Sequence, residues 1–178
     1  MFPKILMPVP LEKIQERFAA RLKQLDAVFE RHVISPISPY RFDQYAFQEG
    51  LISCLWQSWC GFCRSTMIES AIGTTNAAGA TITSPYVGRS EMEIAFISKR
   101  LAYNHTFSSI ATLAGNHLEP TWGDLSKINL IATGLNTTNK ATLLSAFGMG
   151  LSVKDLQICR NANSHVRISE IRDSDFTN

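Results

Sequence analysis

Several features that mark particular classes of protein are missing from this chain of 178 residues. No apolar run reaches the length that a membrane-spanning helix needs. The first ten residues are apolar, but three prolines interrupt them and no charged start precedes a long apolar core, so they make a poor signal peptide. We therefore expect a cytoplasmic protein that makes no association with a membrane.

An excess of charge of one sign is also missing. The chain has 17 basic and 15 acidic residues, and its formal net charge is +2. Nucleic-acid-binding proteins usually concentrate basic residues in a stripe, whereas here they are dispersed among acidic ones along the sequence. Any contact with RNA would therefore need a local patch, for instance one built across a dimer.

Cysteine is scarce, with four residues (Cys54, Cys60, Cys63 and Cys159). In a cytoplasmic protein these are expected to be thiols and not a disulfide framework. The composition that remains is 45% hydrophobic and 18% charged, which is typical of one soluble globular domain. We treat 1–178 as a single domain, in which 1–40 form an N-terminal helix and linker and 41–178 form the core.

Apolar periodicity predicts two long helices in the first half of the chain. Leucine, isoleucine and phenylalanine recur at three- and four-residue spacing from Leu11 to Val33. Two prolines and two serines in the segment Ile34–Tyr40 end that helix. Asp43 is expected to cap the second helix, which runs to about Ile72 and is apolar nearly all around, so we expect it to be the central helix.

The second half predicts shorter helices and very little strand. Thr74–Ser90 is rich in small and polar residues and is read as a long connection, with strand character at Ala80–Thr83. The expected helices run from Glu91 to about Tyr103, from a capping box at Thr121–Asp124 to about Thr133, over Thr138–Phe147, and onward from a second capping box at Ser152–Asp155. The chain has no internal repeat. The prediction is an all-α fold, an irregular bundle of about five to seven helices.

A polar motif, Arg160-Asn161-Ala162-Asn163-Ser164-His165, lies inside the last predicted helix. Residues four apart share a helix face, so Asn161 and His165 are expected one turn apart, with the long side chain of Arg160 able to reach the imidazole. They would stand beside an apolar face made by Leu156, Cys159 and Ala162. Histidine can transfer protons near neutral pH, and an arginine fork can stabilise charge on a phosphoryl oxygen.

This motif resembles the signature of HEPN domains, in which an arginine is followed by a polar residue and, three positions later, by a histidine. The resemblance extends to the preceding segment Ser152–Cys159, to Leu143–Phe147 and Trp122–Asp124, and to the aromatic-rich Leu55–Glu69. It covers roughly Asp43 to Ile171 and is strongest in the last fifty or so residues.

The resemblance implies an all-α, metal-independent endoribonuclease of a toxin–antitoxin or antiviral defence system. His165 would be the general acid or base for attack of a ribose 2′-OH on the adjacent phosphate, Arg160 would stabilise the transition state, and Asn161 would orient the histidine or contact substrate. The products would be a 2′,3′-cyclic phosphate and a 5′-OH end. The implied partners are RNA, a second copy of the chain, and an antitoxin or other defence component; no cofactor or metal is implied.

Two alternatives remain open at the level of sequence. Some HEPN proteins are catalytically silent and bind only nucleotides or partners. The second alternative comes from Trp59-Cys60-Gly61-Phe62-Cys63, which is similar to the redox motif of thioredoxins and would make the chain a thiol–disulfide oxidoreductase. Against it, Phe62 stands where proline is usual, and the residues before the motif continue a helical period where thioredoxins have a strand.

The remaining polar residues favour structural roles. Cys60 and Cys63 lack a second pair of zinc ligands, and His105 and His117 are expected to satisfy local hydrogen bonds. His32 is expected to complement a helix dipole, Trp122 to anchor packing and Asp124 to cap. Charged residues on the long second helix are expected to form an exposed stripe, with a place beside the active site as the sharper alternative (Arg64, Glu69). Downstream arginines are candidates for RNA phosphate contacts (Arg167, Arg172).

Overall fold

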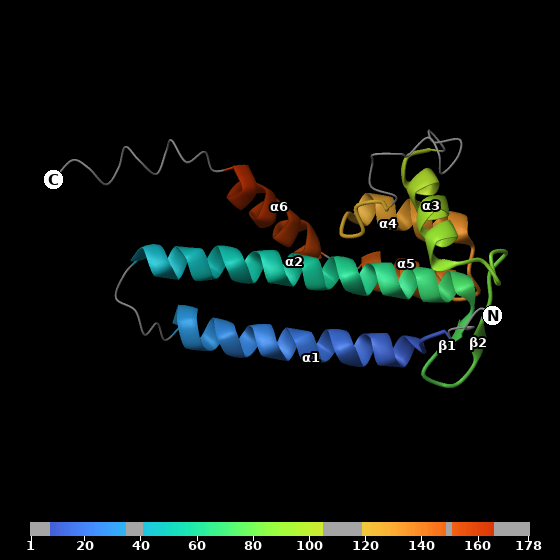
Figure 1. Cartoon of the computed structure of the whole chain (residues 1–178), viewed down its shortest axis with the longest axis horizontal. Coiled ribbons are helices and arrows are strands. Elements are labelled where there is room, and N and C mark those ends of the chain that lie inside the picture. The colour runs from blue at the N-terminus through green and yellow to red at the C-terminus, as the bar shows by residue number, and fades with distance from the viewer. Residues whose placement is uncertain (1–7, 35–40, 105–118, 149–150, 166–178) are drawn as a thin grey trace, which may run out of the picture.

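The fold is a helical bundle built around one long central helix, as a computed structural model of the chain shows (Figure 1). The structure describes residues 8–34, 41–104, 119–148 and 151–165. Six α-helices, one short π-helical segment and two short strands occur in these ranges. The all-α prediction is confirmed. No helix within the described ranges is long and apolar enough to cross a membrane.

Helices α1 (Leu11–Phe29) and α2 (Arg41–Ile72) form an antiparallel hairpin along the long axis of the molecule (Figure 1). A π-helical turn, η1 (Glu30–Ile34), extends α1, so the predicted first helix is confirmed almost to its end. With 32 residues, α2 is about 48 Å long at about 1.5 Å per residue. The predicted cap at Asp43 is wrong, because α2 already begins at Arg41 and Asp43 lies inside its first turn.

A small β-hairpin follows α2. Strands β1 (Thr74–Thr75) and β2 (Thr81–Ile82) pair antiparallel, with Thr74 opposite Ile82. The side chain of Asn76 accepts hydrogen bonds from the backbone N–H groups of Ala78 and Ala80 and so holds the turn. The strand predicted at Ala80–Thr83 is therefore confirmed at its centre.

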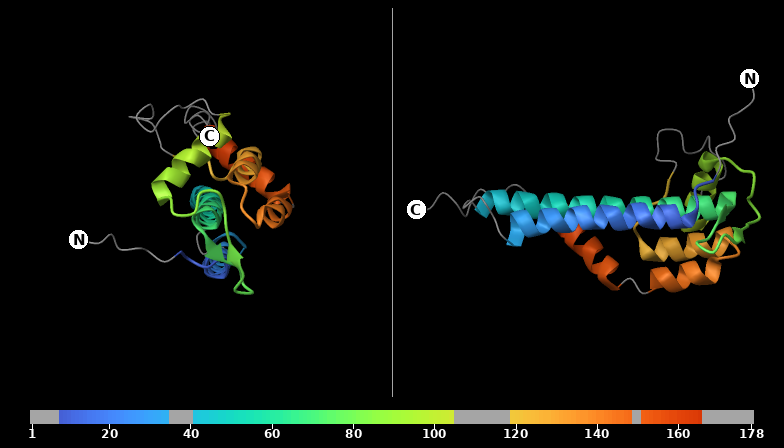
Figure 2. Two further views of the ribbon diagram at one scale, coloured as in Figure 1. Left: turned by 90° about the vertical axis from the view of Figure 1, so that its right-hand side faces the viewer. Right: turned by 90° about the horizontal axis from the view of Figure 1, so that it is seen from below.

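Three short helices pack beside the second half of α2, and the last helix of the chain contacts α2 nearer its middle (Figures 1 and 2). They are α3 (Glu91–Ala102), α4 (Leu125–Leu135), α5 (Lys140–Gly148) and α6 (Leu151–His165). The Ser90 hydroxyl and the Glu93 carboxylate form a capping box at the start of α3.

Both predicted capping boxes of the later helices are wrong. Asp124 itself is the N-cap of α4, and its carboxylate accepts the N–H groups of Ser126 and Lys127, so the helix begins three residues later than a cap at Thr121 would require. Helix α6 begins at Leu151, and Ser152 therefore lies within it. The spacing between a hydroxyl and a carboxylate does not by itself locate the N-cap: Thr121 precedes the cap of α4, and Ser152 follows the start of α6.

The core lies between the second half of α2 and helices α3 to α5. Helices α2, α3 and α4 supply its fully buried side chains, which include Cys63, Met67, Ile94, Ile128, Ile131 and Leu135. Helix α5 adds Leu143 and Phe147, which are buried almost as completely. Trp122 is buried here and anchors the approach to α4, as predicted. The first half of α2 extends beyond this core and lies against α1 and α6 (Figure 2).

Candidate functional site

Helix α6 carries the polar motif and places it on the surface. Arg160 and Asn161 are both exposed, and the Arg160 Nη1 donates a hydrogen bond to the Asn161 Oδ1 over 3.1 Å. His165 is the last residue of α6, so the predicted helical setting of the whole motif is confirmed. The side chain of His165 lies outside the described part of the chain.

The motif helix packs against α2 (Figure 2). Arg160 lies close enough to Cys60 of α2 for its positive charge to lower the pKa of that thiol. Burial has the larger, opposite effect, and the pKa of Cys60 is raised to about 11. The guanidinium of Arg160 therefore stands at the surface above the middle of α2.

The apolar face predicted beside the motif is only partly present. Leu156 is half-buried, but Cys159 is exposed, and the neighbouring Ile158 is 57% exposed. The side chain of Ala162 lies outside the described part. Cys159 is exposed because α6 turns only one side toward α2, which leaves a face with both Ile158 and Cys159 in solvent.

The cysteines of the thioredoxin-like segment lie in the middle of α2, not at a helix N-terminus. Cys63 is fully buried in the core and Cys60 is half-buried; both are free thiols. Burial raises the pKa of Cys63, and the neighbouring Cys60 raises it further. A redox-active pair needs an accessible thiolate, so these two residues have the environment of packed core side chains.

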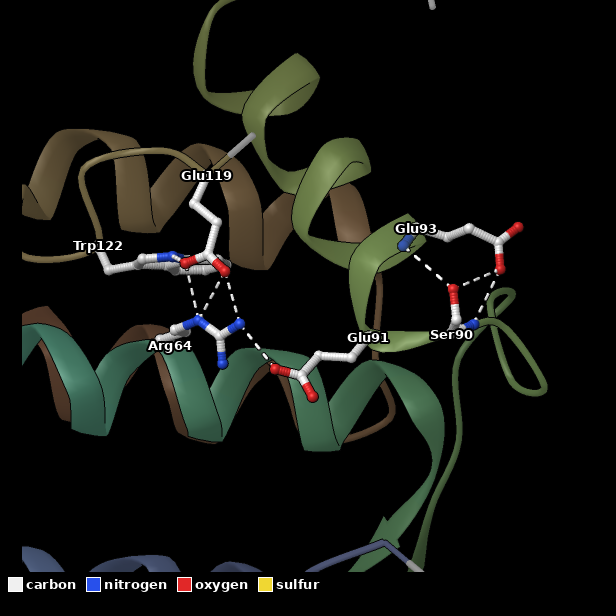
Figure 3. A network of polar contacts seen from close by, with 6 residues as sticks. All are labelled: Arg64, Ser90, Glu91, Glu93, Glu119 and Trp122. Atoms are coloured by element: carbon white, nitrogen blue, oxygen red, sulfur yellow. Dashed lines mark hydrogen bonds and ion pairs between the residues drawn. The ribbon is translucent and has the colours of Figure 1, made fainter. Parts of the chain in front are cut away.

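Arg64 forms a charge network that the sequence reading did not predict (Figure 3). Its Nε donates to both carboxylate oxygens of Glu119, at 2.9 and 2.7 Å, and its Nη2 pairs with the Glu91 carboxylate at 2.7 Å. The Trp122 Nε1 donates to the Glu119 Oε2 at 2.8 Å. These contacts join α2, the start of α3 and the segment before α4.

Both ionised groups of the main pair are stabilised by this network. The hydrogen bond to Glu119 raises the pKa of Arg64, and the hydrogen bond from Arg64 lowers the pKa of Glu119. The predicted exposed stripe is therefore wrong at Arg64. A long-range partner 55 residues away in the chain decides its position, and no local pattern shows such a partner.

Glu69, the other charged residue of α2 considered above, is also half-buried and not exposed. Its Oε2 accepts the backbone N–H of Val9 at 2.9 Å, and the Val9 carbonyl accepts the Thr74 hydroxyl at 2.7 Å. Burial raises the pKa of Glu69. This carboxylate fastens the segment before α1 to the end of α2.

Among the other histidines and the downstream arginines, only His32 lies within the described residues. The His32 ring stacks on the Phe47 ring, with ring centroids 4.6 Å apart, at the end of the helical hairpin where α1 ends and α2 begins. His105, His117, Arg167 and Arg172 lie outside the described residues. Within the described ranges, no three His, Cys, Asp or Glu side chains are grouped closely enough to hold a metal ion.

An apolar groove of about 630 Å³ lies between the C-terminal half of α1 and the N-terminal half of α2. Aliphatic and aromatic side chains line it (Leu22, Leu25, Phe29, Leu51, Ile52 and Leu55), with Lys23 and Asp26 among the few polar groups. No histidine or arginine of the described residues lines it, so this groove is separate from the polar motif on α6.

Comparison of the chain with models of protein families, with curated proteins and with solved structures gives no match. Any assignment of function therefore rests on the geometry of the described residues. Two residues that the sequence reading passed over, Arg17 and Arg21 of α1, line a further groove described below. Their four-residue spacing was the signal that could have identified them.

Proposed function

We propose that this chain is a HEPN-type, metal-independent endoribonuclease whose catalytic residues are Arg160 and His165, with Asn161 in support. The observation that carries the proposal is the arrangement on α6: an exposed Arg160 hydrogen-bonded to Asn161, five residues before the histidine that ends the same helix. A proton-transfer group and a permanent cation on the same helix suit phosphodiester cleavage.

The reaction is an internal transfer at phosphorus. The 2′-oxygen of a ribose attacks the adjacent phosphorus, and the P–O5′ bond breaks. His165 takes the 2′-OH proton or returns a proton to the 5′-oxygen, so that the products are a 2′,3′-cyclic phosphate and a 5′-OH end. No oxidation or reduction occurs, and the proton lost at the 2′-oxygen balances the one gained at the 5′-oxygen.

Arg160 and Asn161 have separate tasks in this scheme. The guanidinium is always charged and presents several donors in a fixed plane, which suits the two non-bridging oxygens of the crowded phosphorane. The Asn161 amide oxygen accepts from Arg160 and limits its rotation, which leaves the amide NH₂ free to contact substrate or the imidazole. Because these groups are exposed, the site is open to a polymer.

A second copy of the chain would complete the site. One motif supplies one histidine, whereas the two proton transfers are best served by two groups on opposite sides of the phosphate. The exposed face of α6, with Ile158 and Cys159, offers an apolar surface beside the motif for a symmetric contact. We therefore propose a homodimer in which two α6 helices face each other.

The proposed setting is a cytoplasmic toxin–antitoxin or antiviral defence system. An open ribonuclease site that needs no metal would damage cellular RNA unless it were restrained. An antitoxin or activating component that covers α6 is the partner that this reasoning implies.

The test is cleavage of end-labelled RNA in EDTA by the parent, by Arg160→Ala and by His165→Ala, with analysis of the product ends. His32→Ala is the matched control, because it removes a histidine near the end of another helix. We expect the parent and the control to cut and leave cyclic phosphate ends. Each α6 variant is expected to lose about 100-fold or more in rate.

Cutting by His165→Ala at the parental rate would contradict the assignment of the histidine. RNA that is bound but left intact by the parent would contradict the nuclease and favour the catalytically silent binding module.

A further inference from the structure

Helix α1 presents two arginines on a flank that carries none of its acidic residues. Arg17 and Arg21 follow each other at one-turn spacing. At about 3.6 residues per turn, the acidic residues of α1 lie roughly 100° or more around the helix from this pair (Glu12, Glu16 and Asp26). Glu16 is in addition paired with Lys13 at 2.7 Å. The arginine pair is thus set apart from the acidic residues of α1, whereas Lys23 lies on their flank.

The two arginines form one edge of a groove of about 200 Å³ between α1 and α2. Its floor contains Phe18 and Phe62, whose rings stack with centroids 4.5 Å apart. Ser58 and Ser65 of α2 stand on the opposite edge. No carboxylate belongs to this lining, so the groove combines positive charge, hydroxyl groups and aromatic surface.

The charge of this edge is available to a ligand. Arg17 and Arg21 are both exposed. Within the described residues Arg17 forms no hydrogen bond or ion pair, and Arg21 donates only to the neutral Gln24 side chain at 3.3 Å. Arginines whose charge is not neutralised by a carboxylate keep their full attraction for phosphate.

Acidic side chains limit the groove on one side. Beyond Arg17 it adjoins a second hollow, which Glu69 and Glu91 line together with Arg64. Carboxylates there disfavour a polyanion, and the Arg64 charge is already engaged by Glu119 and Glu91. A chain of phosphates would therefore continue in another direction.

Helix α2 presents a row of exposed, uncharged residues beside the groove. Ser53, Gln57 and Gly61 follow each other at four-residue spacing, and all three are exposed. Gly61 lines the groove and directly follows Cys60, the residue close to Arg160. The α1 arginines and Arg160 therefore approach α2 at the same level along its length, near Cys60 and Gly61.

We propose that single-stranded RNA binds along this groove, with its phosphates on Arg17 and Arg21, and crosses α2 beside Gly61 to reach Arg160 on α6. A positive groove with aromatic surface is the arrangement by which proteins hold single strands without reading their sequence. The proposal deepens the ribonuclease proposed above and takes RNA as substrate from it. Binding and cleavage are nevertheless measured separately, so that either can fail alone.

The experiment measures the affinity of a fluorescent single-stranded RNA in the uncleaving His165→Ala background. The added changes are Arg17→Ala, Arg21→Ala, the two together, and the control Lys23→Ala, which removes the same charge from the other flank of α1. Circular dichroism and melting establish that each variant is folded. A DNA strand of the same sequence serves as competitor, because it shares the phosphates and lacks the 2′-OH.

We expect the double variant to bind about tenfold or more weakly at low salt. The dependence of log affinity on log salt should become shallower by about 1.4, which is about 0.7 for each of two lost phosphate contacts. Lys23→Ala should bind like its parent, and the DNA strand should compete.

Unchanged affinity in the double variant would overturn the proposal, as would equal weakening by Lys23→Ala or the absence of RNA binding. Tight binding by a parent that cleaves no RNA would support the groove and refute the nuclease.

Discussion

Gly61 occupies the interior of a 32-residue helix, where glycine is unfavourable because its backbone loses the most freedom on folding. A Cβ built at this position meets nothing within 4 Å, so no packing contact requires the glycine. Its presence is consistent with a ligand backbone that passes close to α2.

Alanine substitutions at Gly61 and at a closely packed glycine should change the free energy of unfolding in opposite directions. We predict that Gly61→Ala stabilises the fold by about 0.5–1 kcal/mol in urea unfolding. Gly123→Ala is the contrasting variant, because its Cβ would lie 2.5 Å from the Trp56 ring, and it should destabilise by about 1–3 kcal/mol. A lower free energy of unfolding in Gly61→Ala would contradict the absence of neighbouring atoms around this position of α2.

The thiols differ in reactivity because they differ in burial. At pH 8 we expect iodoacetamide to modify the exposed Cys159 rapidly and the buried Cys63 only on unfolding. Modification of Cys60 should accelerate as the pH rises toward its pKa of about 11, since the thiolate is the reacting form. Peptide mass spectrometry after timed quenching measures all of these rates. Fast modification of Cys60 at pH 7, or a Cys60–Cys63 disulfide under mild oxidation, would revive the oxidoreductase alternative.

At the scale of elements, the Arg64–Glu119 pair holds the segment before α4 on α2. We predict that Glu119→Gln lowers the free energy of unfolding by about 1 kcal/mol at pH 7, a value reduced by the partial exposure of both side chains. Because the pKa of Glu119 is lowered in the folded protein, its contribution is complete above the ordinary pKa near 4.5 and is lost as the pH falls through the lowered value.

The difference between Glu119→Gln and the parent should therefore be present at pH 7 and should shrink as the pH falls below 4.5. Urea unfolding at several pH values measures it, with the exposed Glu49→Gln as the control. A difference that persists unchanged at the lowest pH would show that the carboxylate charge plays no part.

Helix positions were predictable from periodicity, whereas their ends and charge partners were not. The apolar repeat from Leu11 and the long apolar stretch after it correctly predicted α1 and α2. Caps at Asp43, Thr121 and Ser152 were misplaced, because several Ser, Thr and Asp residues near each end fit the same local pattern. Arg64 was misjudged, because Glu119 approaches it only in the folded chain.

At the scale of the whole molecule, α1 and α6 pack against different sides of α2 (Figures 1 and 2). The motif on α6 was predictable as a helical unit, because its residues are neighbours in the sequence. The groove with Arg17 and Arg21 was not, because its other edge comes from Ser58 and Ser65 on a different helix. A near-neutral net charge hid this local separation of charge.

The two sites have different tasks in this account, and RNA cleavage at saturating protein distinguishes them. The measurement is the single-turnover rate of RNA cleavage as a function of protein concentration, for the parent, Arg160→Ala and the Arg17→Ala/Arg21→Ala variant. We predict that Arg160→Ala lowers the maximal rate about 100-fold or more. The double variant should reach the parental rate at a protein concentration about tenfold or more higher. A maximal rate in Arg160→Ala equal to that of the parent would contradict the central claim that α6 carries the chemistry.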